Sequence, residues 1–142
     1  MNIQQIHHHL ESHQIHPSVQ RVAIMQYLFE NNMSHPTVEQ IYADMLPFMP
    51  TLSKATVYNT LRLFVEKKAV VSLFIEERNV RYGLLTTVHA HFRCRCCGCI
   101  YDVPLEKSDI PQFKDNFDFS PDEMQIYYWG NCKKCDNSSA FP

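Results

Sequence analysis

Residues 88–103 read VHAHFRCRCCGCIYDV and hold two histidines, four cysteines and an aspartate in sixteen positions. A further cysteine pair, Cys132 and Cys135, follows in NCKKCD near the end of the sequence. Each C-x-x-C pair forms a tight turn that presents both sulfurs to one ion, and two such pairs supply the four ligands of a tetrahedral zinc site. The spacing therefore predicts a fold held together by a structural zinc ion.

Two C-x-x-C registers overlap in the first stretch, Cys94 with Cys97 and Cys96 with Cys99. Such turns favour a residue with positive φ just after the second cysteine, and glycine adopts this conformation without steric cost. Gly98 follows Cys97, whereas a β-branched isoleucine follows Cys99. We therefore expect zinc ligands at Cys94, Cys97, Cys132 and Cys135. Cys96 and Cys99 are then either inert or oxidisable thiols beside the metal site.

A second group of ligands is distinct from the cysteines. His89 and His91 form an H-x-H pair, and on an extended segment both imidazoles would lie on one face because strand side chains alternate. Asp102 follows the cysteine turn and would return toward them. These residues predict a second metal site.

Helical periodicity dominates the first half of the chain. The expected helices cover residues 3–13, 17–32, 34–46 and 53–70. Thr37 and Gln40 have the spacing of a capping box, and Ser53 is the expected N-cap of the last helix. Two short β-rich runs, 70–75 and 80–85, then predict a hairpin. This layout is typical of a winged helix-turn-helix, with a plain α+β domain as the alternative.

The remaining residues predict a small α/β unit. Strands are expected at 99–105 and 123–129, with a short helix or loop over 106–117. A unit of about 55 residues buries little apolar surface, so we expect metal ligation or dimerisation to help stabilise it. We therefore expect an α+β protein with domains at 1–84 and 85–142.

Composition and charge exclude several classes of protein. No run of 18 apolar residues exists, so no membrane span is expected. The N-terminus lacks a basic region followed by an apolar stretch, which predicts a cytoplasmic protein. The net charge is −2, and residues 1–83 are balanced. Any binding to DNA must therefore depend on the local placement of basic side chains.

The segments HPTVEQIY, SKATVYNTLRLF, HAHFRCRCCGCIYD and CKKC occur in the order and spacing typical of bacterial metal-dependent repressors. From about residue 12 to residue 135, the chain resembles the ferric uptake regulator family. The resemblance implies a winged-helix DNA-binding domain, a C-terminal α/β dimerisation domain, and a hinge near residues 83–87. It also implies a homodimer that binds inverted-repeat, double-stranded operator DNA and represses transcription.

The resemblance also assigns roles to residues. The recognition helix would span 53–64, and SVQR at 18–21 matches a family T-P-Q-R with Val19 in place of proline. A regulatory Fe²⁺, Mn²⁺ or Zn²⁺ would act as a clamp between the two domains, because His35 belongs to the first domain and the other ligands to the second. The implied regulatory ligands are His35, His89, His91 and Asp102. The implied DNA contacts are Arg21, Lys54, Thr56, Tyr58, Asn59 and Arg62.

The sequence departs from the family pattern in two places. Arg81-Tyr82-Gly83 lacks the carboxylate that usually stands two residues after the arginine, so one ligand is missing. In the peroxide-responsive branch this carboxylate helps direct iron toward oxidising the site histidines. The usual histidine before L-x-I-Y is also absent, and Asp122 or Glu123 stands nearby instead.

Two alternatives come from other classes of protein, and a third is a variant of the repressor interpretation. A metallohydrolase using His89 and His91 would need an open metal position and a general base, and no hydrolase motif accompanies them. The chain is therefore not expected to be an enzyme. A zinc-ribbon interaction protein would use only the structural zinc and would not bind DNA. A redox-sensing regulator would act through Cys96 and Cys99.

Overall fold

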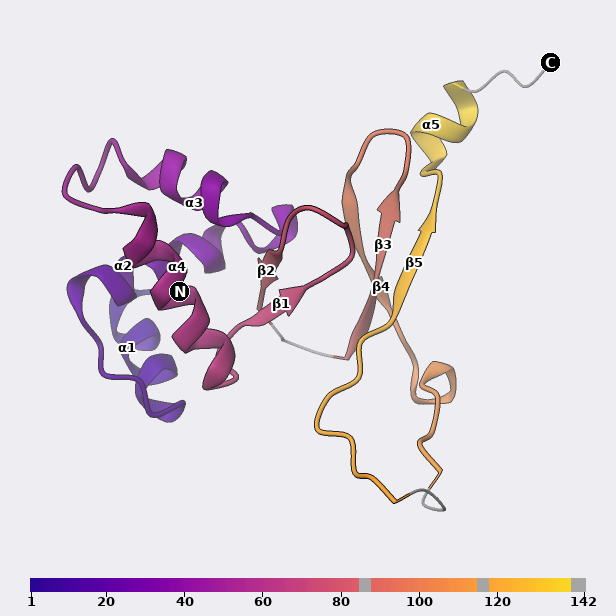
Figure 1. Ribbon diagram of the computed structural model, residues 1–142, viewed down its shortest axis with the longest axis horizontal. Helices are drawn as coiled ribbons and strands as arrows, with labels where there is room; N and C mark the ends of the chain where they lie inside the picture. Colours follow the sequence, from indigo (N-terminus) through magenta and orange to yellow (C-terminus); the bar gives the residue numbers. More distant parts are fainter. Residues whose placement is uncertain (85–87, 115–117, 139–142) are drawn as a thin grey trace. The chain divides into compact units, whose positions relative to one another are not determined.

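The computed structural model describes residues 1–84, 88–114 and 118–138 (Figure 1). The chain divides into two compact units, Met1–Thr86 and Thr87–Pro142. Helices predominate in the first unit and a three-stranded sheet in the second. Within the described residues, no helix is both long and apolar enough to cross a membrane.

Side-chain caps start each of the four helices of the first unit. The Asn2 and Thr37 side chains each form a complete capping box, with Gln5 and Gln40 respectively. The Ser18 hydroxyl accepts from the Arg21 amide, and the Ser53 hydroxyl accepts from the Thr56 amide. These bonds satisfy amides that would otherwise lack a partner, and they fix the helix starts locally. The helices are α1 (Ile3–Ser12), α2 (Val19–Glu30), α3 (Val38–Met45) and α4 (Lys54–Glu66), with a 3-10 turn, η1, at Asn32–Ser34.

One apolar core joins all four helices. Most of its side chains come from the helices, at positions mainly three or four residues apart, as expected for helices with one buried face. The core residues are Ile6, Leu10, Ile15, Ile24, Met25, Leu28, Ile41, Met45, Leu52, Val57, Leu61, Phe64, Ala69, Val70, Tyr82 and Leu84. The predicted helices are thus confirmed, although α4 ends at Glu66, because Lys68 adopts positive φ and the chain turns there.

A short antiparallel hairpin follows α4. It consists of β1 (Val71–Leu73) and β2 (Arg81–Gly83), with Ser72 paired to Tyr82. The hairpin is confirmed with shorter strands than the sequence predicted. The predicted hinge overlaps residues 85–87, which lie outside the described residues.

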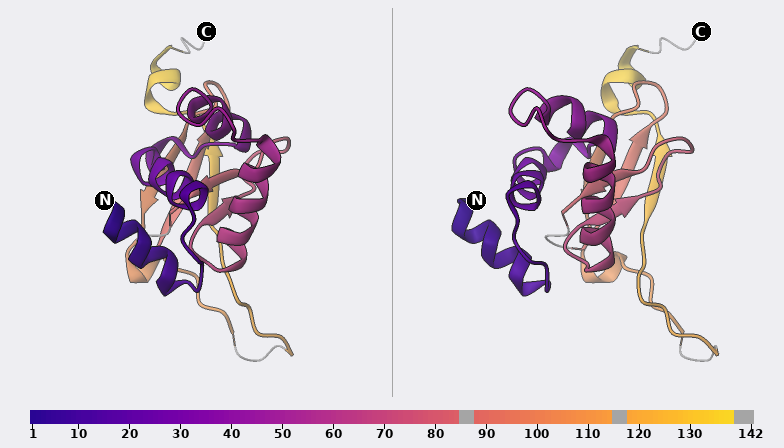
Figure 2. Two further views of the ribbon diagram at one scale, coloured as in Figure 1. Left: turned by 90° about the vertical axis from the view of Figure 1, so that its left-hand side faces the viewer. Right: turned by 60° about the vertical axis from the view of Figure 1, so that its left-hand side comes forward.

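The second unit is built on a three-stranded sheet in the order β4-β3-β5 (Figure 2). Its strands are β3 (His89–Cys94), β4 (Ile100–Pro104) and β5 (Tyr127–Gly130). Strand β3 is antiparallel to β4 and parallel to β5. The parallel pairing follows from the chain direction: β4 runs back to the edge of the sheet where β3 begins, and β5 starts from that edge.

The segment between β4 and β5 and the C-terminal residues differ from expectation in detail. Between β4 and β5, the described residues form only one 3-10 turn, η2 (Lys107–Asp109), while residues 115–117 of the expected helix or loop lie outside them. Strand β5 starts at Tyr127 rather than at residue 123. A short helix, α5 (Lys133–Ser138), follows Cys132 and was not predicted, because six residues with no apolar periodicity give no helical signal.

Candidate functional sites

Four cysteine side chains of the second unit converge. The sulfurs of Cys94, Cys97, Cys132 and Cys135 all lie within 4.8 Å of one another. The Cys97 and Cys132 sulfurs are 3.9 Å apart. Zinc–sulfur bonds of about 2.3 Å in a tetrahedron place the sulfurs about 3.8 Å apart, so this spacing fits one zinc ion. The four are the residues that the sequence predicted; we call them the cysteine tetrad.

Strand pairing explains why cysteines so distant in sequence meet. Because β5 runs parallel to β3, both strands end at the same edge, with Cys94 paired to Gly130. The Arg95 amide donates to the Gly130 carbonyl at 2.7 Å and extends this pairing by one residue. Gly98 has φ +76, as the sequence analysis required of the residue after Cys97. The second C-x-x-C pair begins two residues beyond β5 and thus reaches the first.

Backbone amides favour thiolates at two members of the tetrad. Hydrogen bonds from the Cys97 amide, and then from the Cys132 amide, lower the pKa of the Cys94 thiol to about 6. The Cys135 amide lowers the pKa of Cys132 in the same way. The Cys132 amide lies 3.3 Å from the Cys94 sulfur. Since zinc binds the thiolate form, the turns prepare these sulfurs for a cation.

Three further donors converge on the strands next to the tetrad. His89 and His91 project from the same face of β3, and their Nε2 atoms are 3.1 Å apart. Asp102, which pairs with His91 across β3 and β4, places Oδ1 3.4 Å from both nitrogens. Donors bound to one ion at about 2.1 Å stand about 3.0–3.4 Å apart, so the group fits a divalent metal with nitrogen and oxygen ligands.

His35, the remaining predicted metal ligand, lies in the first unit after η1. It adopts left-handed backbone angles, φ 48 and ψ 65, which are uncommon for a non-glycine residue. Strand β2 holds this turn, because Arg81 Nη1 donates to the His35 carbonyl at 3.1 Å and the Tyr82 amide donates to the Pro36 carbonyl at 3.0 Å. Arg81 also pairs with Glu76. This support could not be predicted from the sequence, because no local pattern links residues 46 positions apart.

Gly83, where the family has a carboxylate, lies beside this turn. A Cβ at residue 83 would meet His35 Cδ2 at 3.5 Å and the Asn32 side-chain oxygen at 3.7 Å, which are ordinary contact distances. That oxygen accepts a hydrogen bond from the Leu84 amide at 2.8 Å. The backbone therefore has room for a side chain at position 83, and any such side chain would start next to His35.

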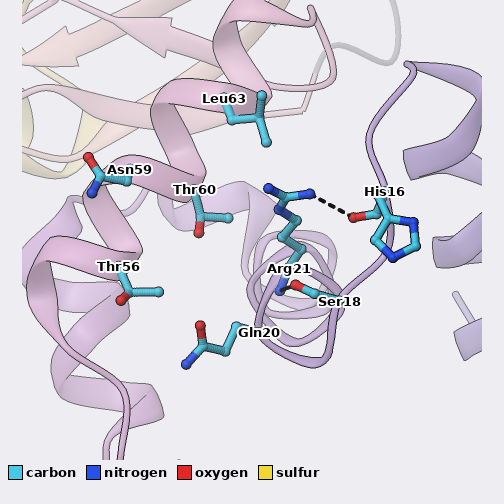
Figure 3. Close-up of a pocket in the computed structure, with 8 residues that line it drawn as sticks. All are labelled: His16, Ser18, Gln20, Arg21, Thr56, Asn59, Thr60 and Leu63. Carbon is cyan, nitrogen blue, oxygen red and sulfur yellow. Dashed lines mark hydrogen bonds between the residues drawn. The ribbon is translucent and has the colours of Figure 1, made fainter.

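Half of the predicted DNA contacts line a concavity of about 430 Å³, most of whose lining residues are polar (Figure 3). Arg21, in the first turn of α2, extends across it and donates to the His16 carbonyl at 2.9 Å. Thr56 and Asn59 line it from α4, together with Thr60 and Leu63. These positions in α4 have the spacing of one helical face, so the concavity lies between that face and the start of α2.

The other predicted DNA contacts form a second stripe on α4. Lys54, Tyr58 and Arg62 are four residues apart, which places them on one helix face, and all three are exposed. Tyr58 has 53% of its surface accessible, which is high for a large aromatic side chain. The Lys54 ammonium lies 5.8 Å from the centre of the Tyr42 ring. The stripe offers two cations and an aromatic ring to a partner.

The model of the ferric uptake regulator family matches residues 12–127. The chain belongs to this family. It is 38% identical to the peroxide-responsive repressor PerR of Staphylococcus epidermidis over 120 residues, which are 82% of this chain and 78% of the relative. Members of the family are transcriptional regulators rather than enzymes, so membership argues against the metallohydrolase alternative.

Solved structures of the family share the fold. The Helicobacter pylori ferric uptake regulator, reported with three functional metal-binding sites, superposes with a TM-score of 0.70 at 18% identity, covering 99% of this chain and 97% of the other. PerR of Streptococcus pyogenes gives a TM-score of 0.52 at 24% identity, covering 94% and 92%. At these identities the likeness concerns the fold alone.

Proposed function

We propose that the protein is a metal-responsive repressor that binds inverted-repeat operator DNA as a homodimer. Residues 1–84 would form a winged-helix DNA-binding domain, and residues 85–142 the dimerisation and metal-binding domain. The convergence of His89, His91 and Asp102 in a chain of this family carries the proposal, because it provides a metal site distinct from the cysteine tetrad.

The two sites would have different tasks. Zn²⁺ at Cys94, Cys97, Cys132 and Cys135 would be structural, because a site closed by four thiolates leaves no position for exchange with solvent. Fe²⁺, Mn²⁺ or Zn²⁺ at His35, His89, His91 and Asp102 would be regulatory. An ion with these four ligands would connect the two domains. It would favour DNA binding only to the extent that it binds the DNA-competent arrangement more tightly than the other arrangement.

The DNA surface would combine the two faces of α4. Tyr58, Asn59 and Arg62 would contact bases and phosphates, and Lys54, Thr56 and Arg21 would contact the backbone. The exposure of Lys54, Tyr58 and Arg62 supports this assignment. So does the position of Arg21 beside Thr56 and Asn59. The chain has no large excess of basic residues, so these local cations would supply most of the attraction to phosphate.

DNA binding can be tested with double-stranded sequences selected from a random pool by the manganese-loaded protein. We expect manganese to raise the affinity at least about tenfold, which is about 1.4 kcal/mol. His91→Ala should remove this gain while leaving the metal-free affinity and the zinc content unchanged. Arg62→Ala should weaken binding with and without manganese and reduce its salt dependence. His8→Ala, on the exposed side of α1, is the matched control.

Two outcomes would contradict the proposal. If the protein selects no DNA, or retains DNA only weakly and without dependence on salt, phosphate contacts are absent and a zinc-ribbon interaction protein is the better description. If binding is salt-dependent but His91→Ala retains the full response to manganese, the regulatory ligands are wrong.

The identity to a peroxide-responsive repressor favours one further candidate function, release of DNA by peroxide. Gly83 argues against this function, because it stands in place of the carboxylate that helps direct iron toward histidine oxidation. We expect the iron-loaded protein to gain no oxygen atom on His89 or His91 after peroxide treatment. Gly83→Asp, which the space beside His35 permits, should tighten metal binding and allow that oxidation. Peptide mass spectrometry reads both results, and oxidation in the unaltered protein would show that the carboxylate is dispensable.

A further inference from the structure

Asn32, the first residue of η1, lies beside the position where the family has a carboxylate. A Cβ on residue 83 would stand 3.7 Å from the Asn32 side-chain oxygen and 3.5 Å from His35 Cδ2. Because Cδ2 is bonded to Nε2, a nitrogen of His35 that can bind metal lies near the same point. Gly83 therefore lacks a carboxylate at a place where an amide oxygen is already present.

Backbone hydrogen bonds hold this oxygen in place. The Leu84 amide donates to Asn32 Oδ1 at 2.8 Å, and an N–H donor identifies the atom it meets as the oxygen of the side-chain amide. The His35 amide donates to the Asn32 carbonyl at 3.4 Å and closes the turn between the two residues. A carbonyl oxygen has two lone pairs, so the bond from Leu84 still leaves one that can bind a cation.

The positions of the two side chains fit a shared task. Asn32 and His35 are three residues apart across a 3-10 turn, and in such a turn side chains at this spacing lie one above the other. His35 is 2% exposed and Asn32 is half-buried, so neither side chain extends freely into solvent. An oxygen and an imidazole are thus presented together, at the point where β2 ends.

Ligand chemistry gives the oxygen a role. Zn²⁺ is usually four-coordinate, and the four proposed regulatory ligands already complete such a shell. Mn²⁺ prefers six ligands and binds well to carbonyl, carboxylate and water oxygens. We propose that Asn32 Oδ1 is an additional ligand of the regulatory ion, and that it favours Mn²⁺ over Zn²⁺ at this site. The first unit would then supply two ligands, Asn32 and His35.

This inference rests on the proposed regulatory site and explains how the chain tolerates Gly83. The amide oxygen is neutral, so it attracts a divalent cation less than a carboxylate does. Gly83→Asp should therefore bind Mn²⁺ more tightly than the unaltered protein. It should also make Asn32 dispensable, because the new carboxylate would start in contact with the Asn32 oxygen and could take its place on the ion.

Metal selectivity tests the role of Asn32. The full-length protein is first loaded with zinc at the cysteine tetrad, and Mn²⁺ or Zn²⁺ binding at the second site is then measured by competition with a chromophoric chelator. We expect Asn32→Ala to weaken Mn²⁺ binding at least about tenfold, the lower end of losses seen when a metal site loses a supporting group. The Zn²⁺ affinity should stay nearly unchanged. Asn32→Asp keeps the oxygen and should retain Mn²⁺ binding. Met33→Ala, in the same turn and 71% exposed, is the matched control.

Solvent proton relaxation reports on the coordination itself. A ligand that is lost from Mn²⁺ is replaced by water, so the ion bound to Asn32→Ala should carry an extra exchangeable water molecule. Asn32→Asp and Met33→Ala should show no such increase. A residue that only supports the turn would not change the number of bound waters in this way.

The double variant adds an independent check. In the Gly83→Asp background, Asn32→Ala should cost little Mn²⁺ affinity, because the carboxylate now supplies the oxygen. The two substitutions would then be strongly non-additive, as expected for groups that serve the same ion.

The possible failures are distinguishable. Equal losses of Mn²⁺ and Zn²⁺ affinity in Asn32→Ala, or a loss that persists in the Gly83→Asp background, would overturn the inference and leave Asn32 with a supporting role at the His35 turn. Unchanged Mn²⁺ affinity in Asn32→Ala, with binding still abolished by His91→Ala, would overturn it and leave the proposed regulatory site standing. If His91→Ala also leaves Mn²⁺ binding unchanged, the proposed regulatory site fails together with the inference.

Discussion

The two units of this protein differ in what stabilises them. The first has a continuous apolar core from four capped helices. Among the described residues of the second, only Ala90, Cys94 and Ile100 are buried and apolar. Tyr101, Tyr128 and Trp129 on its sheet are 40–49% exposed. The first unit can thus fold by burying side chains, whereas the second has too small a core and would depend on bound metal and on a partner subunit.

The largest effect should come from a change to the tetrad. Cys132→Ser removes one of the four proposed zinc ligands, and zinc binding contributes about 10–16 kcal/mol to small zinc-dependent domains. We expect the second unit to lose its fold while the first keeps its helices. Trp129, the single tryptophan of the chain, reports on the second unit by fluorescence, and far-ultraviolet circular dichroism reports on the helices. Ser108→Ala, at an exposed position, is the control. An unchanged Trp129 unfolding curve would mean that the metal is not what holds this unit.

The corresponding change in the first unit is Phe64→Ala. Phe64 is fully buried in the core, so its loss should cost about 3–5 kcal/mol of unfolding free energy. Zinc content should not change. Phe48→Ala is a matched control, because Phe48 is 86% exposed and should contribute less than about 0.5 kcal/mol. Urea denaturation followed by circular dichroism measures the unfolding free energy of both variants. Equal effects of the two substitutions would refute the role given to the apolar core.

A smaller effect is expected from the cap of α3. Thr37→Ala removes the hydroxyl that accepts from the Gln40 amide at 3.2 Å, at a cost of about 1 kcal/mol. Thr37→Ser keeps this acceptor and should recover most of the loss. Thr51→Ala, on the exposed loop before α4, controls for the substitution itself. Thermal unfolding temperatures rank the three variants by stability. If Thr37→Ser is destabilised as much as Thr37→Ala, loss of the cap is not the cause.

The smallest effect concerns pH and the attachment of α1. Burial is the main cause that lowers the pKa of His9 below 6.5, followed by charge repulsion from His13 and His8. The native state therefore binds fewer protons than the unfolded chain once the pH falls below 6.5, so stability should decrease toward the lowered pKa. The His9 ring packs edge-on against Phe29, with the ring centres 5.4 Å apart, so its protonation weakens the contact of α1 with α2.

His9→Gln should flatten this pH dependence, and His8→Gln, at an exposed position, should not. Urea midpoints measured for the first unit at about pH 7.5 and pH 5.5 test the difference. If the urea midpoint changes with pH by the same amount in His9→Gln as in the unaltered protein, another group causes the acid sensitivity.

Local signals in the sequence predicted most of the fold. Thr37 with Gln40, and Ser53 before Lys54, marked helix starts that the structure confirms, because a cap and its partner are only three residues apart. The change from helical to alternating periodicity located the β1–β2 hairpin. The short helix α5 and the exact start of β5 were not predicted, because neither has a periodic apolar pattern of its own.

The two candidate metal sites divide in the same way. The sequence by itself determined the choice of Cys97 over Cys99, since Gly98 alone can take φ +76 without strain, and it determined that His89 and His91 share a strand face. Tertiary structure decided which distant residues meet. Strand β5 pairs parallel to β3 and brings Cys132 to Cys94, and β4 places Asp102 opposite His91. The Arg81 side chain holds the turn at His35 through a hydrogen bond to its carbonyl. The physical reason is that strand register and long-range hydrogen bonds depend on the packing of the whole unit, which no short stretch of sequence specifies.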